Sequence, residues 1–311
     1  MDRNQIKGCG TALVTPFRQN GSLDEAALRR HLRFQIESGI NFLVPCGTTG
    51  ESPTLSSEEH FRVVEITVEE AKGRVPVMGG AGGNNTRRVC EGIQVLERLG
   101  VDAILSVSPY YNKPTQEGLF QHYRALAAST RLPILTYNVP GRTGSNIEPQ
   151  TLARLSAIPN IMGVKEASGT VGQTEKILGM VPENFQVFSG DDAMTLPLMA
   201  IGACGVISVA ANVIPGEMTA MVSLANAGDF TAARSQYRRF LPLFNALFIE
   251  SNPIPVKAAL ALMGRIDPVY RLPLVPLHAD NQAKLSQVLR NLDLLAKEKE
   301  KEKEYAAGGA D

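Results

Sequence analysis

The sequence predicts a (β/α)8 barrel followed by a small C-terminal helical subdomain. Eight short apolar runs alternate with longer amphipathic stretches, and successive runs lie about 30 residues apart, as expected for βα units. The runs lack the polar alternation of a strand with one wet face, so they are interpreted as parallel strands buried on both sides. The chain has 311 residues and 44% apolar composition, which is enough for a core of this size.

The expected strands are taken in chain order. They are GTALVTP (10–16), FLVPC (42–46), VPVMGG (75–80), DAILSV (102–107), PILTYN (133–138), IMGVK (161–165), QVFSG (186–190) and CGVIS (204–208). A doubly wound open sheet is the alternative. It would usually carry a G-x-G-x-x-G turn after the first strand, whereas this chain has TPFRQNGS there.

Amphipathic helices are predicted between the strands. In residues 24–39 the apolar stripe is Leu28, Leu32 and Ile36, and residues 88–99 carry a similar stripe. Two S-x-x-E sequences, 22–25 and 56–59, are interpreted as capping boxes at helix starts.

The strand signal stops after about residue 227, and helices are expected at 229–249, 254–263 and 280–300. The first of these carries one largely aromatic stripe, and NPIP (252–255) is interpreted as a connector. The stripe residues are Phe230, Ala233, Tyr237, Phe240, Phe244 and Phe248. We therefore expect a barrel over 1–227, a helical subdomain over 228–300 and a charged tail over 301–311.

Composition excludes several classes of function. Lys plus Arg and Asp plus Glu both number 31, so no basic surface for nucleic acid or anionic membrane is indicated. The four cysteines form no C-x-x-C pair and are interpreted as reduced thiols in a cytoplasm. No signal peptide and no apolar run of about 18 residues is found, so no membrane span is expected.

The chemistry is expected where strands end, because barrel sites are built at the carboxyl ends of the strands. Lys165 closes the run IMGVK, although lysine is rarely buried. If Lys165 points inward, strand alternation makes Gly163 and Ile161 point inward too, and Gly163 leaves room beneath the lysine stem. Lost hydration favours the neutral amine, which alone can attack a carbonyl to form an imine. A strand-end lysine considered alone more often extends to solvent.

Hydroxyl groups are expected beside this amine. Tyr137 lies at the end of one expected strand, and Thr48 and Tyr111 follow two others. Hydroxyls that both donate and accept can relay protons. Thr49 and the amides of its turn suit one substrate carboxylate, and the guanidinium fork of Arg142 suits another. Taken alone, each of these residues is more simply interpreted as a core, turn or surface residue. Taken together with Lys165, they favour a catalytic or substrate-binding role.

Metal catalysis is not favoured. The four histidines lie in helical patterns or near the C-terminus, not at strand ends, whereas a zinc aldolase would need them at the barrel mouth. Asp191 and Asp192 open a helix and are interpreted as caps rather than metal ligands.

A series of motifs in order resembles the dihydrodipicolinate synthase / N-acetylneuraminate lyase superfamily over residues 6–292. The motifs are ALVTPF, GTTGESPTL, SPYYNKPTQEGL, YNVPGRTG, GVKEASG, FSGDDA, GVISVAANV and NPIPVK. The YYN stretch and the arginine of PGRTG favour the synthases over the sialic acid lyases, but a related 2-oxo-acid aldolase stays open. A barrel that only binds a 2-oxo acid is the third alternative.

The resemblance implies a role for each matching residue. Lys165 forms a Schiff base with pyruvate, and Thr48, Tyr137 and Tyr111 relay protons, with Tyr111 supplied by a neighbouring subunit. Thr49 holds the pyruvate carboxylate, Arg142 receives the carboxylate of L-aspartate semialdehyde, and the backbone carbonyls of Gly190 and Ile207 line the site. The resemblance further implies that the protein acts in lysine and diaminopimelate biosynthesis and uses no metal or organic cofactor. It also implies a homotetramer built from two dimers.

The resemblance also implies an allosteric lysine cleft, to which Ser52, Asn84 and Tyr110 belong. Ser57 and Arg88 stand where lysine-inhibited members carry an aromatic or histidine and an acidic residue, and Pro53 is unusual beside Ser52. Because Arg88 would repel a lysine ammonium, we expect weak or no inhibition by lysine.

Overall fold

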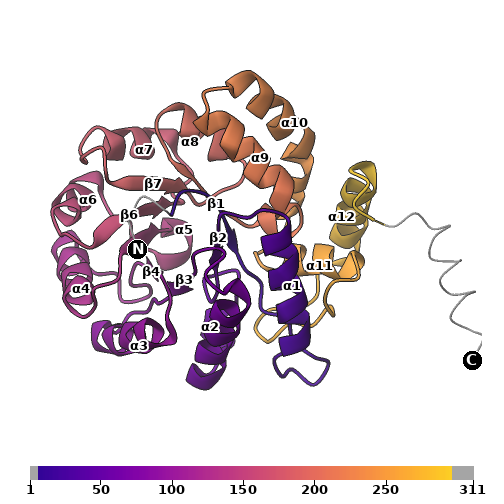
Figure 1. The fold of residues 1–311 in the computed structure, drawn as a ribbon, viewed down its shortest axis with the longest axis horizontal. Helices are drawn as coiled ribbons and strands as arrows, with labels where there is room; N and C mark the ends of the chain where they lie inside the picture. The colour runs from indigo at the N-terminus through magenta and orange to yellow at the C-terminus, as the bar shows by residue number, and fades with distance from the viewer. Residues whose placement is uncertain (1–5, 296–311) are drawn as a thin grey trace, which may run out of the picture.

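The computed structural model describes residues 6–295, and it shows eight parallel strands surrounded by helices (Figure 1). The strands are β1 (Gly8–Ala12), β2 (Phe42–Val44), β3 (Met78–Gly80), β4 (Ala103–Val107), β5 (Ile134–Asn138), β6 (Ile161–Glu166), β7 (Gln186–Ser189) and β8 (Gly205–Ser208). Seven neighbouring pairs are parallel ladders, and a parallel bridge between Leu43 and Val77 joins β2 to β3. The sheet is thereby closed. The predicted (β/α)8 barrel is confirmed, and the open-sheet alternative is wrong.

Nine α-helices follow the strands through β8, and most form the outer ring. They are α1 (Glu25–Glu37), α2 (Ser57–Ala71), α3 (Thr86–Leu99), α4 (Gln116–Ala128), α5 (Pro140–Thr143), α6 (Pro149–Ser156), α7 (Val171–Leu178), α8 (Thr195–Ala200) and α9 (Pro215–Asn226). Short 3-10 turns, η2 (Ser52–Thr54) and η3 (Ala210–Asn212), follow β2 and β8. The ring covers the outer face of the strands, which explains why their sequences are apolar throughout.

One predicted capping box is confirmed and the other is wrong. Ser56 accepts from the Glu59 amide, and Glu59 accepts from the Ser56 amide, so this box opens α2 as expected. At α1 the cap is Asp24, whose carboxylate accepts from the Ala27 amide at 2.9 Å. Ser22 instead donates to Asn20 within the preceding turn, because the helix begins two residues later than the motif indicated.

The barrel interior is a packed core beneath the site. Its side chains include Phe42, Leu105, Leu135, Phe188 and Ile207, and the rings of Phe42 and Phe188 meet edge to face with centroids 5.7 Å apart. A second and larger core lies between the strands and the helices.

The inward face of β6 differs from the prediction. Ile134 pairs with Ile161 and Leu135 with Gly163, so Met162 is an extra residue on β6 and alternation is interrupted there. Ile161 therefore packs in the outer core and Met162 in the interior. Gly163 does not make room for the lysine stem either. A Cβ there would lie 2.0 Å from the Gln186 carbonyl oxygen, so this glycine permits close contact between β6 and β7.

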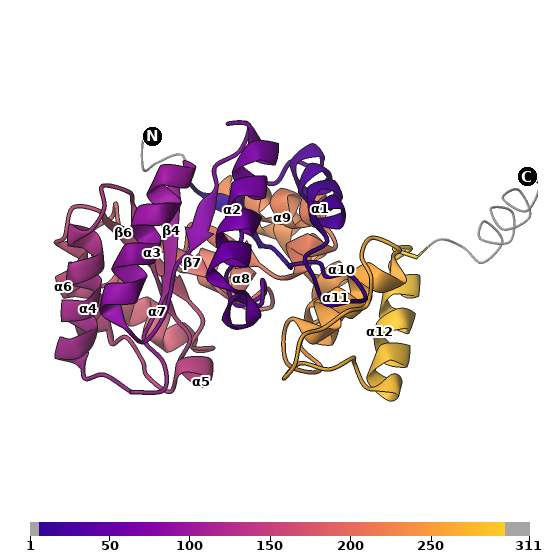
Figure 2. The same cartoon turned by 90° about the horizontal axis from the view of Figure 1, so that it is seen from below.

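Three helices follow the barrel: α10 (Phe230–Ala246), α11 (Ile254–Leu262) and α12 (Ala279–Asn291). They pack on one another and on α9 and η3, and Figure 2 places them toward the same end of the barrel as α5. The aromatic stripe of α10 is buried at Phe240 and Phe244. The helix ends at Ala246, so the predicted stripe residue Phe248 lies beyond it and is 45% exposed.

The helix predicted over 280–300 ends earlier, at Asn291. Residues 292–295 are not helical, and the last five residues of that prediction and the tail at 301–311 lie outside the described residues. The division of the chain at residue 227 stays a prediction. Among residues 6–295, no helix is both long and apolar enough to cross a membrane.

Candidate active site

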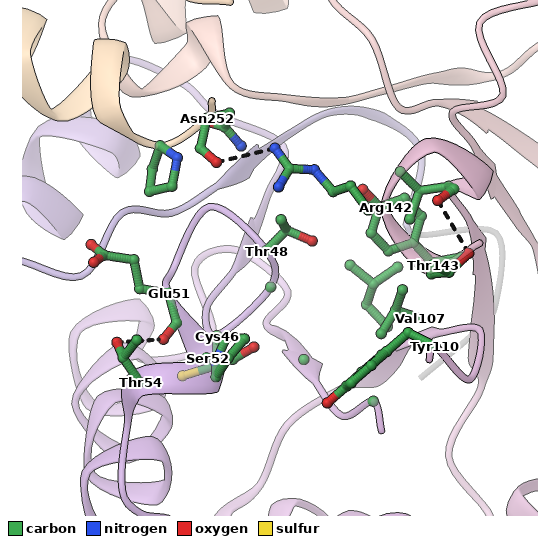
Figure 3. A pocket seen from close by; sticks show the side chains of 18 of the residues that line it. Cys46, Thr48, Glu51, Ser52, Thr54, Val107, Tyr110, Arg142, Thr143 and Asn252 are labelled. Atoms are coloured by element: carbon green, nitrogen blue, oxygen red, sulfur yellow. Dashed lines mark hydrogen bonds between the residues drawn. The ribbon is translucent and has the colours of Figure 1, made fainter. Parts of the chain in front are cut away.

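A cavity of about 400 Å³ opens at the carboxyl ends of the strands (Figure 3). Its walls come from the loops after β2, β3, β4 and β5 and from the segments around Asn252 and Pro273 in the C-terminal part. Among the predicted site residues, Thr48, Tyr137, Arg142, Ser52 and Tyr110 line it. The barrel and the C-terminal segment therefore build this cavity together.

Lys165 is buried at the end of β6. Its side chain is 5% exposed, and Nζ lies 4.3 Å from the centroid of the Tyr137 ring, which itself lines the cavity. The pairing of β5 with β6 places the two residues side by side in register. The amine of Lys165 is thus buried at the mouth of the barrel, next to the ring of Tyr137, as predicted.

The loop after β2 presents the two threonines on a tight turn. The Gly50 and Glu51 amides donate to the Gly47 and Thr48 carbonyls, each at 3.1 Å, and the Thr15 hydroxyl donates to the Gly50 carbonyl at 2.7 Å. Among the described residues, no acceptor takes a hydrogen bond from the Thr48 or Thr49 amide. The turn therefore offers two free N–H groups, which suits a carboxylate.

Arg142 lies in the short helix α5 and is exposed. Its Nη2 donates to the main-chain oxygen of Asn252 at 3.0 Å, and Figure 3 shows the side chain extending toward that residue. The guanidinium keeps further N–H groups for a ligand in the cavity.

Tyr111 is not brought to the cavity of its own chain. It has φ +71° and is 89% exposed, whereas the neighbouring Tyr110 lines the cavity. The predicted role of Tyr111 in the site of a neighbouring subunit therefore stays a proposal.

Neither Gly190 nor Ile207 is among the residues that line the cavity, and their predicted role stays a prediction. A Cβ on Gly190 would lie 3.0 Å from Lys165 Cε and 2.6 Å from Ala167 Cβ, so only glycine leaves space for the lysine stem. Ile207 is fully buried in the barrel interior. The prediction was that Gly163 leaves room for the Lys165 side chain, but Gly190 provides that room instead.

Sequence reasoning missed four residues at this site. Asn252 donates to the Thr49 hydroxyl at 3.0 Å, and Lys257 forms a buried ion pair with Glu51. Asn252 and Lys257 lie in NPIPVK, one of the motifs that carry the resemblance, but the prediction gave neither residue a role. His60 lines the cavity from α2, where one ring nitrogen lies 2.9 Å from the Gly80 carbonyl oxygen. The expectation that every histidine lies away from the barrel mouth is therefore wrong.

Burial lowers the pKa of His60, with the Gly80 hydrogen bond opposing the shift. The shift favours the neutral form of the imidazole. Among residues 6–295, no three His, Cys, Asp or Glu side chains are grouped so as to hold a metal ion.

A second cavity, of about 320 Å³, adjoins the first. Ser57, Asn84, Arg88 and Tyr110 line it, and His60 and Tyr110 belong to both cavities. Ser52 and Pro53 line only the first cavity, so they share it with Tyr110 but are separated from Ser57, Asn84 and Arg88.

The fold and the site define the class of protein: a (β/α)8-barrel enzyme with a buried lysine at the end of its sixth strand. The chain matches the model of the Dihydrodipicolinate synthetase family over residues 5–292, and it belongs to that family.

Known relatives are similar over nearly their whole length. A 4-hydroxy-tetrahydrodipicolinate synthase of Koribacter versatilis (strain Ellin345) is 54% identical over 94% of this chain and 97% of its own. The crystal structure of dihydrodipicolinate synthase from Thermotoga maritima has a TM-score of 0.92 and 44% identity, covering 94% of this chain and all of its own. The enzyme from Acinetobacter baumannii, complexed with pyruvate, has a TM-score of 0.92 and 43% identity, covering 93% and 100%.

Proposed function

We propose that this protein condenses pyruvate with L-aspartate semialdehyde to give 4-hydroxy-tetrahydrodipicolinate, a step in diaminopimelate and lysine biosynthesis. The single observation that carries the proposal is the buried Lys165 amine against Tyr137 at the mouth of the barrel. The name of the Koribacter relative and the pyruvate complex of the Acinetobacter enzyme support the choice of substrates.

The first half of the reaction activates pyruvate. The neutral amine of Lys165 attacks C2 of pyruvate, and the carbinolamine loses water to give an imine. Loss of a proton from C3 then gives an enamine. The Thr48 and Thr49 amides hold the pyruvate carboxylate, and Tyr137 and Thr48 carry protons to and from the reacting atoms. No cofactor takes part, because the imine itself withdraws the electrons.

The second half joins the two substrates. The enamine carbon attacks the aldehyde carbon, and the new alkoxide takes a proton from the hydroxyl relay. The amino group of the former semialdehyde then attacks the imine carbon, closes the ring and expels Lys165 as a free amine. Arg142 binds the second carboxylate with the guanidinium N–H groups that Asn252 does not use.

Assembly completes the proposed relay. Tyr111 is 89% exposed in this chain, and we propose that it enters the cavity of a neighbouring subunit in a homotetramer of two dimers. The substrates are small metabolites, and we place the enzyme in the cytoplasm, where its pathway and its free thiols belong.

Two experiments test the function. Borohydride reduction in the presence of pyruvate should add mass to the peptide that contains Lys165, and no adduct would contradict every enzymatic hypothesis. A panel of aldehydes and sugar acids should then show the highest kcat/KM for aspartate semialdehyde. A different preferred acceptor would identify another pyruvate-dependent aldolase of the same superfamily.

A further inference from the structure

A buried ion pair joins the C-terminal helices to the turn that carries the two threonines. Lys257 Nζ in α11 lies 2.5 Å from Glu51 Oε1, and both side chains are fully buried. Lys and Glu are almost never buried to this degree unless paired. The two residues are 206 positions apart in the chain, so the pair fixes one end of the turn against the C-terminal segment.

Lys257 is the one cation bonded to this carboxylate among the described residues. The Nζ atom also lies 4.4 Å from the centroid of the Phe17 ring and 5.3 Å from that of Tyr270. The neighbouring Arg271 is occupied by Glu59 and by the Gly21 and Thr54 carbonyls. Removing Lys257 would therefore leave the buried Glu51 carboxyl group without its ion-pair partner.

Glu51 holds the turn in an uncommon backbone conformation. Its φ is +56°, in the left-handed region that residues with a Cβ seldom adopt. Its amide closes the turn onto the Thr48 carbonyl, and its own carbonyl accepts from the Thr54 amide and hydroxyl. Such a conformation persists only where surrounding contacts determine it, and the ion pair is one of those contacts.

A second contact from the same segment reaches the turn itself. The Asn252 side-chain amide donates to the Thr49 hydroxyl at 3.0 Å, whereas Arg142 binds the main-chain oxygen of Asn252. The side chain of Asn252 thus contacts the turn proposed to bind the pyruvate carboxylate, and its backbone contacts Arg142, which is proposed to bind the carboxylate of the semialdehyde. Changing the side chain should disturb only the first.

We propose that Lys257 and Asn252 are positioning residues for the pyruvate carboxylate: Lys257 fixes Glu51, and with Asn252 it orients the Thr48–Thr49 turn. This inference rests on the proposed function of that turn. The alternative is that the pair serves only folding. Replacing both members of a buried pair with neutral side chains of similar shape often preserves stability, which allows the two roles to be separated.

The test compares Lys257→Met with the double variant Glu51→Gln/Lys257→Met. Lys284→Met, on the exposed surface of α12, is the matched control. The single variant should unfold at a lower temperature, and the double variant should recover most of that loss. The double variant should still show a pyruvate KM about tenfold higher and slower borohydride trapping, because a misplaced turn binds the carboxylate less well. The control should match the wild type.

Asn252→Ala gives an independent test in which the main-chain oxygen stays. It should raise the KM for pyruvate several-fold and leave the KM for the semialdehyde within about twofold of the wild-type value.

The inference is overturned if the double variant regains wild-type pyruvate KM along with stability, or if Asn252→Ala changes neither KM or both equally. Absence of a pyruvate adduct in the wild-type enzyme would instead reject the proposed function. The two failures are therefore distinguishable.

Discussion

Gly190→Ala tests whether the space beside Lys165 controls catalysis. The added Cβ would lie 2.6 Å from Ala167 Cβ, 3.0 Å from Lys165 Cε and 3.1 Å from the Glu166 oxygen. All three separations are shorter than ordinary carbon contacts, so something must move. The Glu166 carbonyl is held by the Gly190 amide at 2.8 Å, whereas the lysine stem is flexible. The tightest contact is with Ala167, two residues after Lys165, so relieving it shifts the chain at the end of β6; we therefore expect Lys165 to be displaced.

The size of the effect follows from overpacking. An extra methyl group in a tightly packed site typically costs about 1–3 kcal/mol. Each ~1.4 kcal/mol that appears in the activation barrier lowers the rate tenfold, so kcat/KM should fall about 10- to 100-fold. The rate of borohydride trapping with pyruvate should fall in parallel, because imine formation is the step that needs the amine in place.

Gly92→Ala is the matched control, since no heavy atom lies within 4 Å of its added Cβ. Gly92 lies inside helix α3, where alanine should raise the free energy of unfolding by about 0.5–1 kcal/mol and leave activity unchanged. A Gly190→Ala enzyme that is destabilised but traps pyruvate at the wild-type rate would refute the reasoning.

Four further predictions follow from the same structure. Lys165→Ala should abolish the borohydride adduct while circular dichroism shows the barrel intact; an adduct elsewhere would contradict it. Tyr111→Phe should lower kcat about 100-fold with little change in melting temperature, since the side chain is 89% exposed in the protomer, and dissociating the dimer should cost activity as well. Lysine should inhibit weakly in steady-state assays, because Arg88 lines the second cavity; strong inhibition at sub-millimolar lysine would oppose this. Hydrogen bonds from Arg33, opposed by burial, lower the pKa of Glu70 to about 2. The ionised Glu70 therefore stabilises the folded protein fully above about pH 4.5, and this contribution is lost as the pH falls toward 2. Glu70→Gln should therefore lower the melting temperature at pH 7 and change it little at pH 2.

Much of the fold was predictable because its signals are local. Strands buried on both faces are apolar throughout, and each of the eight predicted runs overlaps a strand, although β1 begins two residues before its run and β6 ends one residue after its run. The cap at Ser56 was predictable because its capping box spans only four consecutive residues. Local reasoning failed at β6, where one extra residue moved Ile161 to the outer core, and at α1, where Asp24 caps the helix instead of Ser22.

The sequence by itself determined the barrel, the lysine at the end of the sixth strand and the polar residues that follow the other strands. These features depend on residue type and on spacing along the chain. Only the tertiary structure decided which of them meet. Asn252 reaches Thr49 across 203 positions, and Lys257 reaches Glu51 across 206. Tyr111 does not line the cavity of its own chain, and Gly190 rather than Gly163 adjoins the lysine stem. No local pattern encodes such contacts, because they arise when closure of the sheet and packing of the last helices bring distant segments together.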